Sequence, residues 1–278
     1  MLIACRAGLT EDHAARVVSA DNIAVWKGDK IAVWKGNDMG AKLNLGWWPK
    51  AAWVAAALAS VFAAHGWAQE TDKPTVVPVT NAAFHQFTFQ SENMSLENVT
   101  LPPGFSTGYH SHDQDLIFVI TAGAKIKNQV LGKEPVELEF KLGEVRFAPY
   151  TKTPGTHQII NIEKENTMRL LALGIVYSAP GRYTVSTRPA KYEVALDNDR
   201  VRAWRLKLNP GESAPPIRQT APGARFVVTG GMVAEKRTGR PDQPIVLQNH
   251  DFMTINAEER GIENLGNNPV ELVEVELK

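Results

Sequence analysis

The sequence predicts an all-β protein of two similar barrels, because short strand-like runs fill residues 69–278 and the second half repeats the first. Apolar and polar residues alternate within these runs, which is typical of strands with one buried face. Turn residues separate the runs at the spacing of a sandwich or barrel, and no run of ten or more residues has the period of an amphipathic helix. The runs are AFHQFTFQ, MSLENVTL, LIFVI, PVELEFKL, EVRFAP, HQIINI and MRLLALGIVY.

The internal repeat sets the expected domain boundary. RVRAWRLKLNPGES at 200–213 parallels MSLENVTLPPGFS at 94–106, and ARFVVTGGMV later parallels LIFVITAGAK. The closing segments IENLGNNPVELVEVELK and IINIEKENTMRLLALGIV also correspond. A repeat of this length indicates duplication of a whole structural unit. We therefore expect one barrel at 69–185 and a second at 186–278.

The N-terminal part differs in composition and is excluded from the fold prediction. An alanine-rich apolar run at 51–64 follows Lys50 and precedes a small-residue pair at Gly66 and Ala68. This is the layout of a secretory signal peptide, so we expect one at 39–68 with cleavage after Ala68. The mature protein would then be periplasmic or secreted. A membrane anchor is the alternative, although the run is short for a bilayer span.

A near-repeat marks the segment before the expected signal peptide. IAVWKGD at 23–29 returns as IAVWKGN at 31–37, and Met39 follows two residues later. Met39 would be a normal start for a signal peptide. We therefore expect residues 1–38 to come from an upstream start-site assignment, or to be a disordered extension.

Charge and cysteine content exclude several functions. Without residues 1–68 the chain keeps 23 of 30 Lys and Arg and 25 of 30 Asp and Glu, a net charge near −2. This charge provides no basic surface for nucleic acid. The single cysteine, Cys5, excludes a disulfide framework and a cysteine-based zinc cluster. A mature chain without cysteine suits an oxidising compartment.

Three histidines form the candidate metal site. His110 and His112 lie two residues apart at the start of a strand-like run, so both side chains leave the same face. His157 follows 45 residues after His112, on a later predicted strand. Imidazole is the commonest protein ligand for transition metals, and ligands beside open coordination positions make a reactive site. We expect one divalent ion (Fe, Mn, Ni, Cu or Zn) bound by His110, His112 and His157.

These residues resemble the two motifs of the cupin superfamily. The first motif is a glycine, five residues, HxH, three or four residues, Glu, six residues and a glycine. Gly104 and the two histidines fit it, whereas Asp115 stands near the usual Glu and Gly123 then lies one residue late. The second motif is a glycine, five residues, Pro, a turn, His, three residues and Asn. It fits Gly143, Pro149, His157 and Asn161 with a longer turn.

The resemblance implies a bicupin, in which two jelly-roll (double-stranded β-helix) barrels follow in tandem. It also implies Asp115 as the fourth ligand and, as in quercetinase-like members, as a catalytic base. Three histidines plus water is the alternative, and Asp113 is less favoured because it points to the opposite strand face. Ile117 and Val119 share the face of Asp115 and are expected to form an apolar cavity wall. His85 could support the ligands, but a plain strand-face position is favoured.

The second barrel lacks the ligands. Ile217 and Gln219 stand at the positions of the first two histidines, and Arg260 stands at the third. We favour a structural role for this barrel. The alternative is a pocket for an anionic small molecule, lined by Arg218, Gln219 and Arg225. His250, in a turn, is expected at the surface.

The function expected from the resemblance is that of a metal-dependent dioxygenase-type oxidoreductase, or an isomerase, acting on a small organic molecule. A non-catalytic binding or accessory protein for a metabolite or metal is the alternative, and a structural barrel with unmetallated histidines is the third possibility. Fold alone does not choose among these functions. A small-molecule ligand is the expected partner, with no nucleic acid and no membrane insertion after cleavage. The chain is expected to be a monomer or a homodimer.

Overall fold

Four mainly antiparallel β-sheets make up the part of the protein from β4 (Val76–Pro78) to the C-terminus. The computed structural model describes residues 17–19, 22–27, 30–35, 73–177, 179–237 and 239–278. Residues Thr71–Lys278 form one compact unit and residues Met1–Glu70 another. No α-helix occurs in the described residues, and none of their helical segments is long and apolar enough to cross a membrane.

The first barrel consists of two five-stranded sheets. One sheet has the order β10-β9-β12-β7-β4 and the other β11-β8-β13-β6-β5. The first sheet contains β4 (Val76–Pro78), β7 (Tyr109–His112), β9 (Ala124–Val130), β10 (Val136–Phe140) and β12 (Gly155–Asn161). The second contains β5 (His85–Gln90), β6 (Met94–Leu101), β8 (Leu116–Ala122), β11 (Val145–Ala148) and β13 (Met168–Ile175). A short 3-10 turn, η1 (Val79–Asn81), links β4 to β5.

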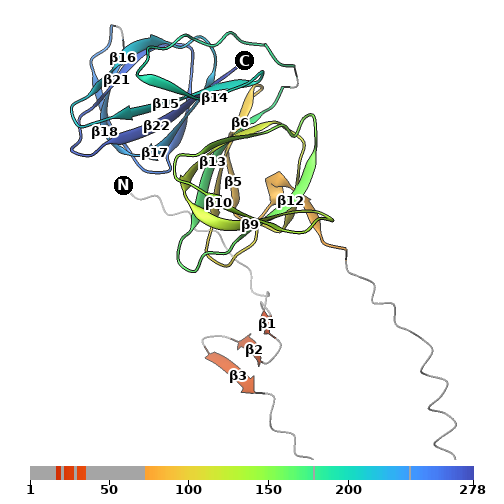
Figure 1. Ribbon diagram of the computed structural model, residues 1–278. Helices are drawn as coiled ribbons and strands as arrows, with labels where there is room; N and C mark the ends of the chain where they lie inside the picture. Colours follow the sequence, from red (N-terminus) through yellow and green to blue (C-terminus); the bar gives the residue numbers. More distant parts are fainter. Residues whose placement is uncertain (1–16, 20–21, 28–29, 36–72, 178, 238) are drawn as a thin grey trace, which may run out of the picture. The chain divides into compact units, whose positions relative to one another are not determined.

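The second barrel repeats this plan, which confirms the expected all-β architecture of two jelly-roll barrels (Figure 1). Its sheets have the orders β14-β15-β22-β17-β20 and β16-β21-β18-β19. The first sheet contains β14 (Tyr192–Asp197), β15 (Val201–Leu208), β17 (Gly223–Thr229), β20 (Phe252–Ile255) and β22 (Val270–Leu277). The second contains β16 (Ser213–Arg218), β18 (Gly231–Arg237), β19 (Gln243–Leu247) and β21 (Glu259–Asn264). The central trio β6, β13 and β8 thus corresponds to β15, β22 and β17, as the sequence repeat predicts.

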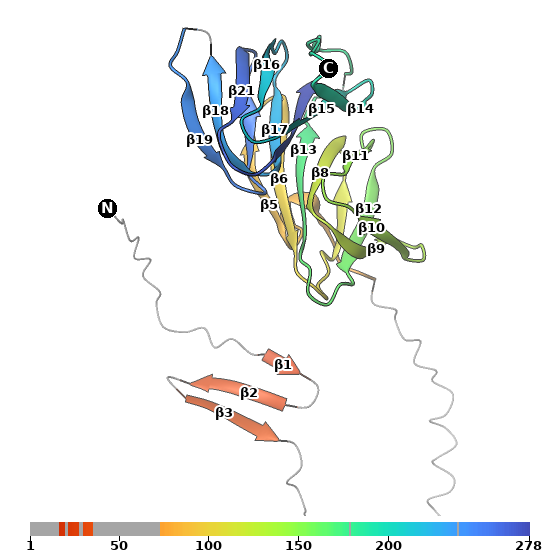
Figure 2. The same ribbon diagram turned by 60° about the vertical axis from the view of Figure 1, so that its left-hand side comes forward.

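The two barrels share an apolar core between these central trios. Ile117 and Val119 of β8 belong to the same buried cluster as Phe226 of β17 and Val275 of β22. Figures 1 and 2 show the two barrels side by side. The expectation that Ile117 and Val119 line the cavity of the first barrel is therefore wrong. Both faces of β8 are covered, so its apolar residues alone do not indicate which face is the inner one.

The N-terminal part contains a small sheet of its own. β1 (Val17–Ser19) pairs with β2 (Asn22–Lys27), which pairs with β3 (Lys30–Lys35). The near-repeat noted in the sequence accounts for β2 and β3, which pair antiparallel with Ile23 opposite Trp34. Whether residues 1–38 belong to the natural protein stays a prediction. The expected signal peptide at 39–68 and its cleavage position lie outside the described residues.

Candidate metal site

Strand pairing brings the three predicted histidines together inside the first barrel. His110 and His112 lie on β7, and His157 lies on the neighbouring strand β12, directly opposite His110. Their ligand nitrogens all lie within 4.8 Å of one another. The Nε2 atoms of His112 and His157 are 3.2 Å apart. Three imidazoles of one sheet therefore point at a common position in the barrel.

Hydrogen bonds orient two of the three imidazoles. His110 Nδ1 lies 3.0 Å from the Gly108 carbonyl oxygen, and His157 Nδ1 lies 2.8 Å from Asn128 Oδ1. A carbonyl oxygen only accepts, so Nδ1 carries the proton in both rings and the Nε2 lone pair stays free. Such a partner fixes the tautomer and the ring plane of a metal-binding histidine. The donor set therefore fits a divalent transition metal.

Ring stacking orients the third imidazole. Among the described residues His112 Nδ1 has no hydrogen-bond partner, but the ring of Tyr150 stacks on it at 4.6 Å between centroids and 9° between planes. Gly155 makes room for this ring, because a Cβ there would lie 2.9 Å from the Tyr150 ring. Sequence reasoning did not identify Tyr150. The one sequence feature that could have indicated Tyr150 is its position directly after Pro149, in the turn of the second motif.

A fourth histidine lies at the same cavity. The His85 ring is 4.7 Å from that of His110, and its Nδ1 donates to the Ala83 carbonyl at 2.9 Å. The favoured sequence interpretation, a plain strand-face histidine, is corrected by this placement. His85 is not one of the three residues whose ligand atoms cluster. It supplies a further imidazole on the opposite sheet.

Burial keeps these imidazoles neutral. Together with the neighbouring imidazoles, burial lowers the pKa of His157 to about 3, of His112 to about 2 and of His85 to about 4, and burial is the larger cause in each. Neutral imidazole is the form that binds a metal ion. At neutral pH the site therefore needs no proton release before a metal can bind.

The predicted acid does not join the histidines. Asp115 forms a buried ion pair with Arg200 of the second barrel at 2.9 Å, and its Oδ1 accepts the Thr151 N–H at 2.9 Å. Leu116, one residue on, lines the cavity instead. Three residues separate His112 from Leu116 and six separate Leu116 from Gly123, so Leu116 occupies the acid position of the first motif. Asp115 points the other way because successive strand residues face opposite sides.

A different acid faces the cavity. Glu97 of β6 lines the same cavity as the histidines and is 4% exposed. Its Oε2 has no hydrogen-bond partner in the described part of the chain. Burial raises the pKa of its carboxyl to about 7. Sequence reasoning missed Glu97, although in MSLENVTL it shares the strand face of Val99 and Leu101, where an acid is out of place.

The cavity itself is mainly apolar and has a volume of about 240 Å³. Its one arginine, Arg146, is paired with Glu144 at 2.8 Å and lies over the Phe140 ring at 4.7 Å. The charge of Arg146 is therefore already compensated. The apolar wall residues are Val99, Leu116, Phe118, Leu138, Phe140, Phe147, Ala148, Ile159 and Leu170.

Several solved structures are similar to this chain. AerE from Microcystis aeruginosa is 13% identical with a TM-score of 0.54, over 74% of this chain and 97% of that one. A cupin 2 conserved barrel domain protein from Leptotrichia buccalis is 9% identical with a TM-score of 0.45, over 70% and 88%. Salicylate 1,2-dioxygenase from Pseudoaminobacter salicylatoxidans, solved as adducts with gentisate, is 12% identical with a TM-score of 0.47, over 67% and 68%.

This chain has the bicupin fold. No protein-family model and no curated protein matches the sequence. At 13% identity the likeness to AerE shows the fold alone.

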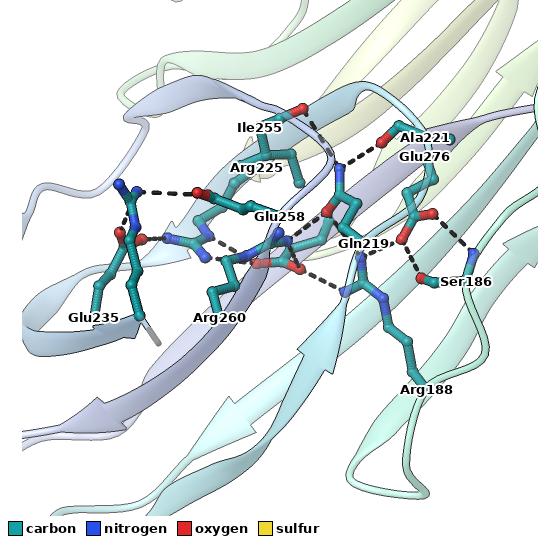
Figure 3. Close-up of polar contacts among 12 residues, drawn as sticks. Ser186, Arg188, Gln219, Ala221, Arg225, Glu235, Ile255, Glu258, Arg260 and Glu276 are labelled. Carbon is teal, nitrogen blue, oxygen red and sulfur yellow. Dashed lines mark hydrogen bonds and ion pairs between the residues drawn. The ribbon is translucent and has the colours of Figure 1, made fainter. Parts of the chain in front are cut away.

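The second cupin barrel has a buried network of ion pairs where the first has its histidines, beside an apolar cluster that includes Ile217 (Figure 3). Gln219 and Arg260, at the positions of His112 and His157, contact each other at 2.6 Å. Arg260 also pairs with Glu274 at 2.8 Å. Arg225, opposite Glu274 in the sheet, pairs with it at 2.8 Å. The polar groups of Gln219 and Arg225 are thus used within this network, which supports the structural role over the anion pocket.

The segment between the two cupin barrels completes this network. Arg188 reaches Glu274 at 2.5 Å and Glu276 at 2.7 Å, and it stacks over Trp204 at 4.0 Å. Ser186 donates to Glu276 at 2.6 Å. Figure 3 shows Gln219 among the side chains of Arg188, Arg260 and Glu276. Sequence reasoning did not identify Arg188, because it lies outside any strand and its partners lie about 90 residues away.

Proposed function

We propose that the first cupin barrel binds one divalent transition metal through His110, His112 and His157, and uses it to oxidise a small organic molecule in the manner of a dioxygenase. One observation carries the proposal. Three neutral imidazoles converge on one position at the wall of a mainly apolar cavity. Three protein ligands leave coordination positions for a substrate. Fe, Mn, Ni, Cu or Zn suits imidazole donors, and a bound ion of this kind supplies Lewis acidity or redox chemistry.

The cavity supports a small, mainly apolar substrate with an acidic hydroxyl. A cavity of about 240 Å³ suits a molecule of about one aromatic ring, since cavities of roughly 150 Å³ take up benzene. Glu97 is the one cavity carboxyl in the described chain without a partner. We infer that it accepts the hydroxyl proton of an enol or phenol. Its raised pKa, about 7, is near the value at which a carboxylate is an effective base at neutral pH.

The proposal is tested first by elemental analysis of the protein purified without a metal-affinity tag. We expect about one transition-metal ion per chain, absent from the His110→Ala, His112→Ala double variant. His250→Ala serves as the control, because His250 lies in the second barrel and its loss should leave the metal content unchanged. Oxygen uptake by the iron-loaded protein with single-ring phenols and enols then tests the oxidation.

The outcomes of this test distinguish three functions. Metal with oxygen uptake supports the dioxygenase, and metal without uptake by any compound supports the non-catalytic binding protein instead. A wild-type protein that holds no metal, even after reconstitution, would overturn the proposal and leave a structural barrel.

We also propose that the protein is exported to the periplasm or beyond the cell. The observation behind this is the signal-peptide layout of residues 39–68. Mass spectrometry of the protein recovered from cells that express the full chain should give a chain beginning at Gln69. Recovery of an uncleaved chain from the cytoplasm would contradict export.

A further inference from the structure

The three metal-site imidazoles are not held in the same way. His110 and His157 each donate Nδ1–H to an oxygen of their own barrel. His112 instead lies flat against Tyr150, and besides the contact of its Nε2 with His157 at 3.2 Å this stack orients its ring plane. Whatever holds Tyr150 in place therefore also sets the direction of the His112 lone pair.

Tyr150 belongs to a turn that is tied down at its next residue. The Thr151 N–H donates to Asp115 Oδ1 at 2.9 Å, and the Asp115 N–H donates back to Thr151 Oγ1 at 3.1 Å. Two reciprocal hydrogen bonds fix the turn to the start of β8. Asp115 itself is buried, so these bonds are shielded from water and strengthened by the low local dielectric.

The second barrel holds Asp115 from the other side. Arg200 Nε lies 2.9 Å from Asp115 Oδ2, and the two side chains are 3% and 4% exposed. The backbone of Arg200 is fixed in turn. Its backbone N–H donates to Asn198 Oδ1 at 2.8 Å, and its backbone carbonyl accepts the Lys278 N–H at 2.8 Å. At the surface Lys152 of the same turn pairs with Asp199 at 3.3 Å.

We propose that the ligand-free second barrel positions a metal ligand of the first: Arg200 holds Asp115, Asp115 holds the turn at Thr151, and the turn presses Tyr150 onto His112. Asp115 and Arg200 are thus positioning residues. The inference rests on the proposed metal site, and it gives the second barrel a part in that site beyond covering a sheet. It also explains why an acid stands beside the motif without facing the metal position.

The test uses Co²⁺ alone as the probe, with a proton NMR measurement on the metal-free protein beside it. We expect Arg200→Met and Tyr150→Leu each to lower Co²⁺ affinity by about 10- to 100-fold, the loss usual when a metal-bound histidine loses its supporting partner. Both should change the visible spectrum of the bound Co²⁺ alike. In the metal-free protein both should remove the ring-current shift that Tyr150 imposes on the His112 ring protons.

Matched variants separate this role from a general loss of stability. Tyr150→Phe keeps the stack. Arg202→Met removes the partly exposed pair with Asp197 and a long contact with the Trp204 ring, both away from the chain of contacts to His112, so both variants should behave as wild type. Arg200→Lys keeps the charge without the planar guanidinium and should recover part of the affinity. Because Arg200 and Tyr150 act along one path, the double variant should bind Co²⁺ no more weakly than Tyr150→Leu alone.

A folded Arg200→Met protein with the wild-type His112 shift and Co²⁺ affinity would overturn the inference, and so would multiplicative losses in the double variant. If Arg200→Met does not fold, Thr151→Val, which lacks the hydroxyl that Asp115 contacts, carries the same expectation. A wild-type protein that binds no Co²⁺ would contradict the proposed metal site. The NMR measurement would still decide the positioning role in that case.

Discussion

Glu274→Gln will destabilise the protein by about 3–5 kcal/mol, the loss typical of a buried ion pair that loses one partner. Glu274 accepts from three buried guanidinium groups, those of Arg188, Arg225 and Arg260. These cations hold the pKa of its carboxyl well below the usual range, although burial acts in the opposite direction. With a neutral amide of the same shape, Arg188 and Arg225 keep one carboxylate each, Glu276 and Glu235. Arg260 then has no carboxylate partner in the described part of the chain, and the buried cluster keeps an excess positive charge away from water.

Urea unfolding measures this effect as a lower transition midpoint with an unchanged slope. Glu263→Gln is the matched control, because Glu263 pairs with Lys236 at an exposed position and such pairs contribute little. The Glu274 contribution is present above the unfolded-state pKa of the carboxyl, 4.5, and disappears as the pH falls through the folded-state value. If both variants unfolded at the same urea concentration as wild type, the network would have no role in stability.

Glu97→Leu will stabilise the metal-free protein, by about 3 kcal/mol at pH 8. Burial raises the pKa of Glu97 from 4.5 to about 7, and each pKa unit corresponds to about 1.4 kcal/mol. The sign follows from proton binding. Below pH 4.5 the carboxyl is neutral in both states and costs nothing through ionisation. As the pH rises to about 7 only the unfolded chain is ionised, so the folded state becomes progressively less favoured.

Thermal unfolding at pH 4.5 and pH 8 tests this prediction. The gain from Glu97→Leu should be largest at pH 8, and Glu97→Gln should gain less because its buried amide still lacks partners. An equal gain at both pH values would show that the ionisation of Glu97 is not its cause. The same Leu variant should lose the oxygen uptake proposed for the site while it keeps its metal, since the histidines are untouched. A carboxyl that costs stability at this position is understandable as a functional group.

Local patterns were sufficient for the strands, the two barrels and the three histidines. The spacing of two in His110-Ser111-His112 fixes a shared strand face, and the matching of the two halves predicted the vacant ligand positions of Gln219 and Arg260. The acid was placed wrongly for an equally local reason. When a motif position is assigned one residue too early, the residue chosen lies on the opposite strand face. Asp115 was chosen in this way, whereas Leu116 stands at the motif position and faces the cavity.

The remaining site residues reach the cavity by tertiary packing. Glu97 comes from the sheet opposite the histidines, and Tyr150 comes from a turn whose length departs from the motif. In the second barrel, Arg188 is supplied by the connecting segment. No sequence periodicity predicts these contacts. Glu97 and the three histidines belong to different sheets, and Tyr150 and Arg188 lie outside any strand.

The sequence by itself determined what depends on neighbours along the chain: an all-β fold, its duplication, a histidine pair on one face and the ligands missing from the second half. Only the tertiary structure decided which face of β8 points into the first barrel. The second barrel covers the other face, so apolar residues stand on both faces and the sequence pattern does not distinguish them. The tertiary structure therefore also decided that Glu97 is the acid facing the cavity and that Asp115 pairs with Arg200. Alternation divides a strand into two faces, but only packing against other sheets gives each face its environment.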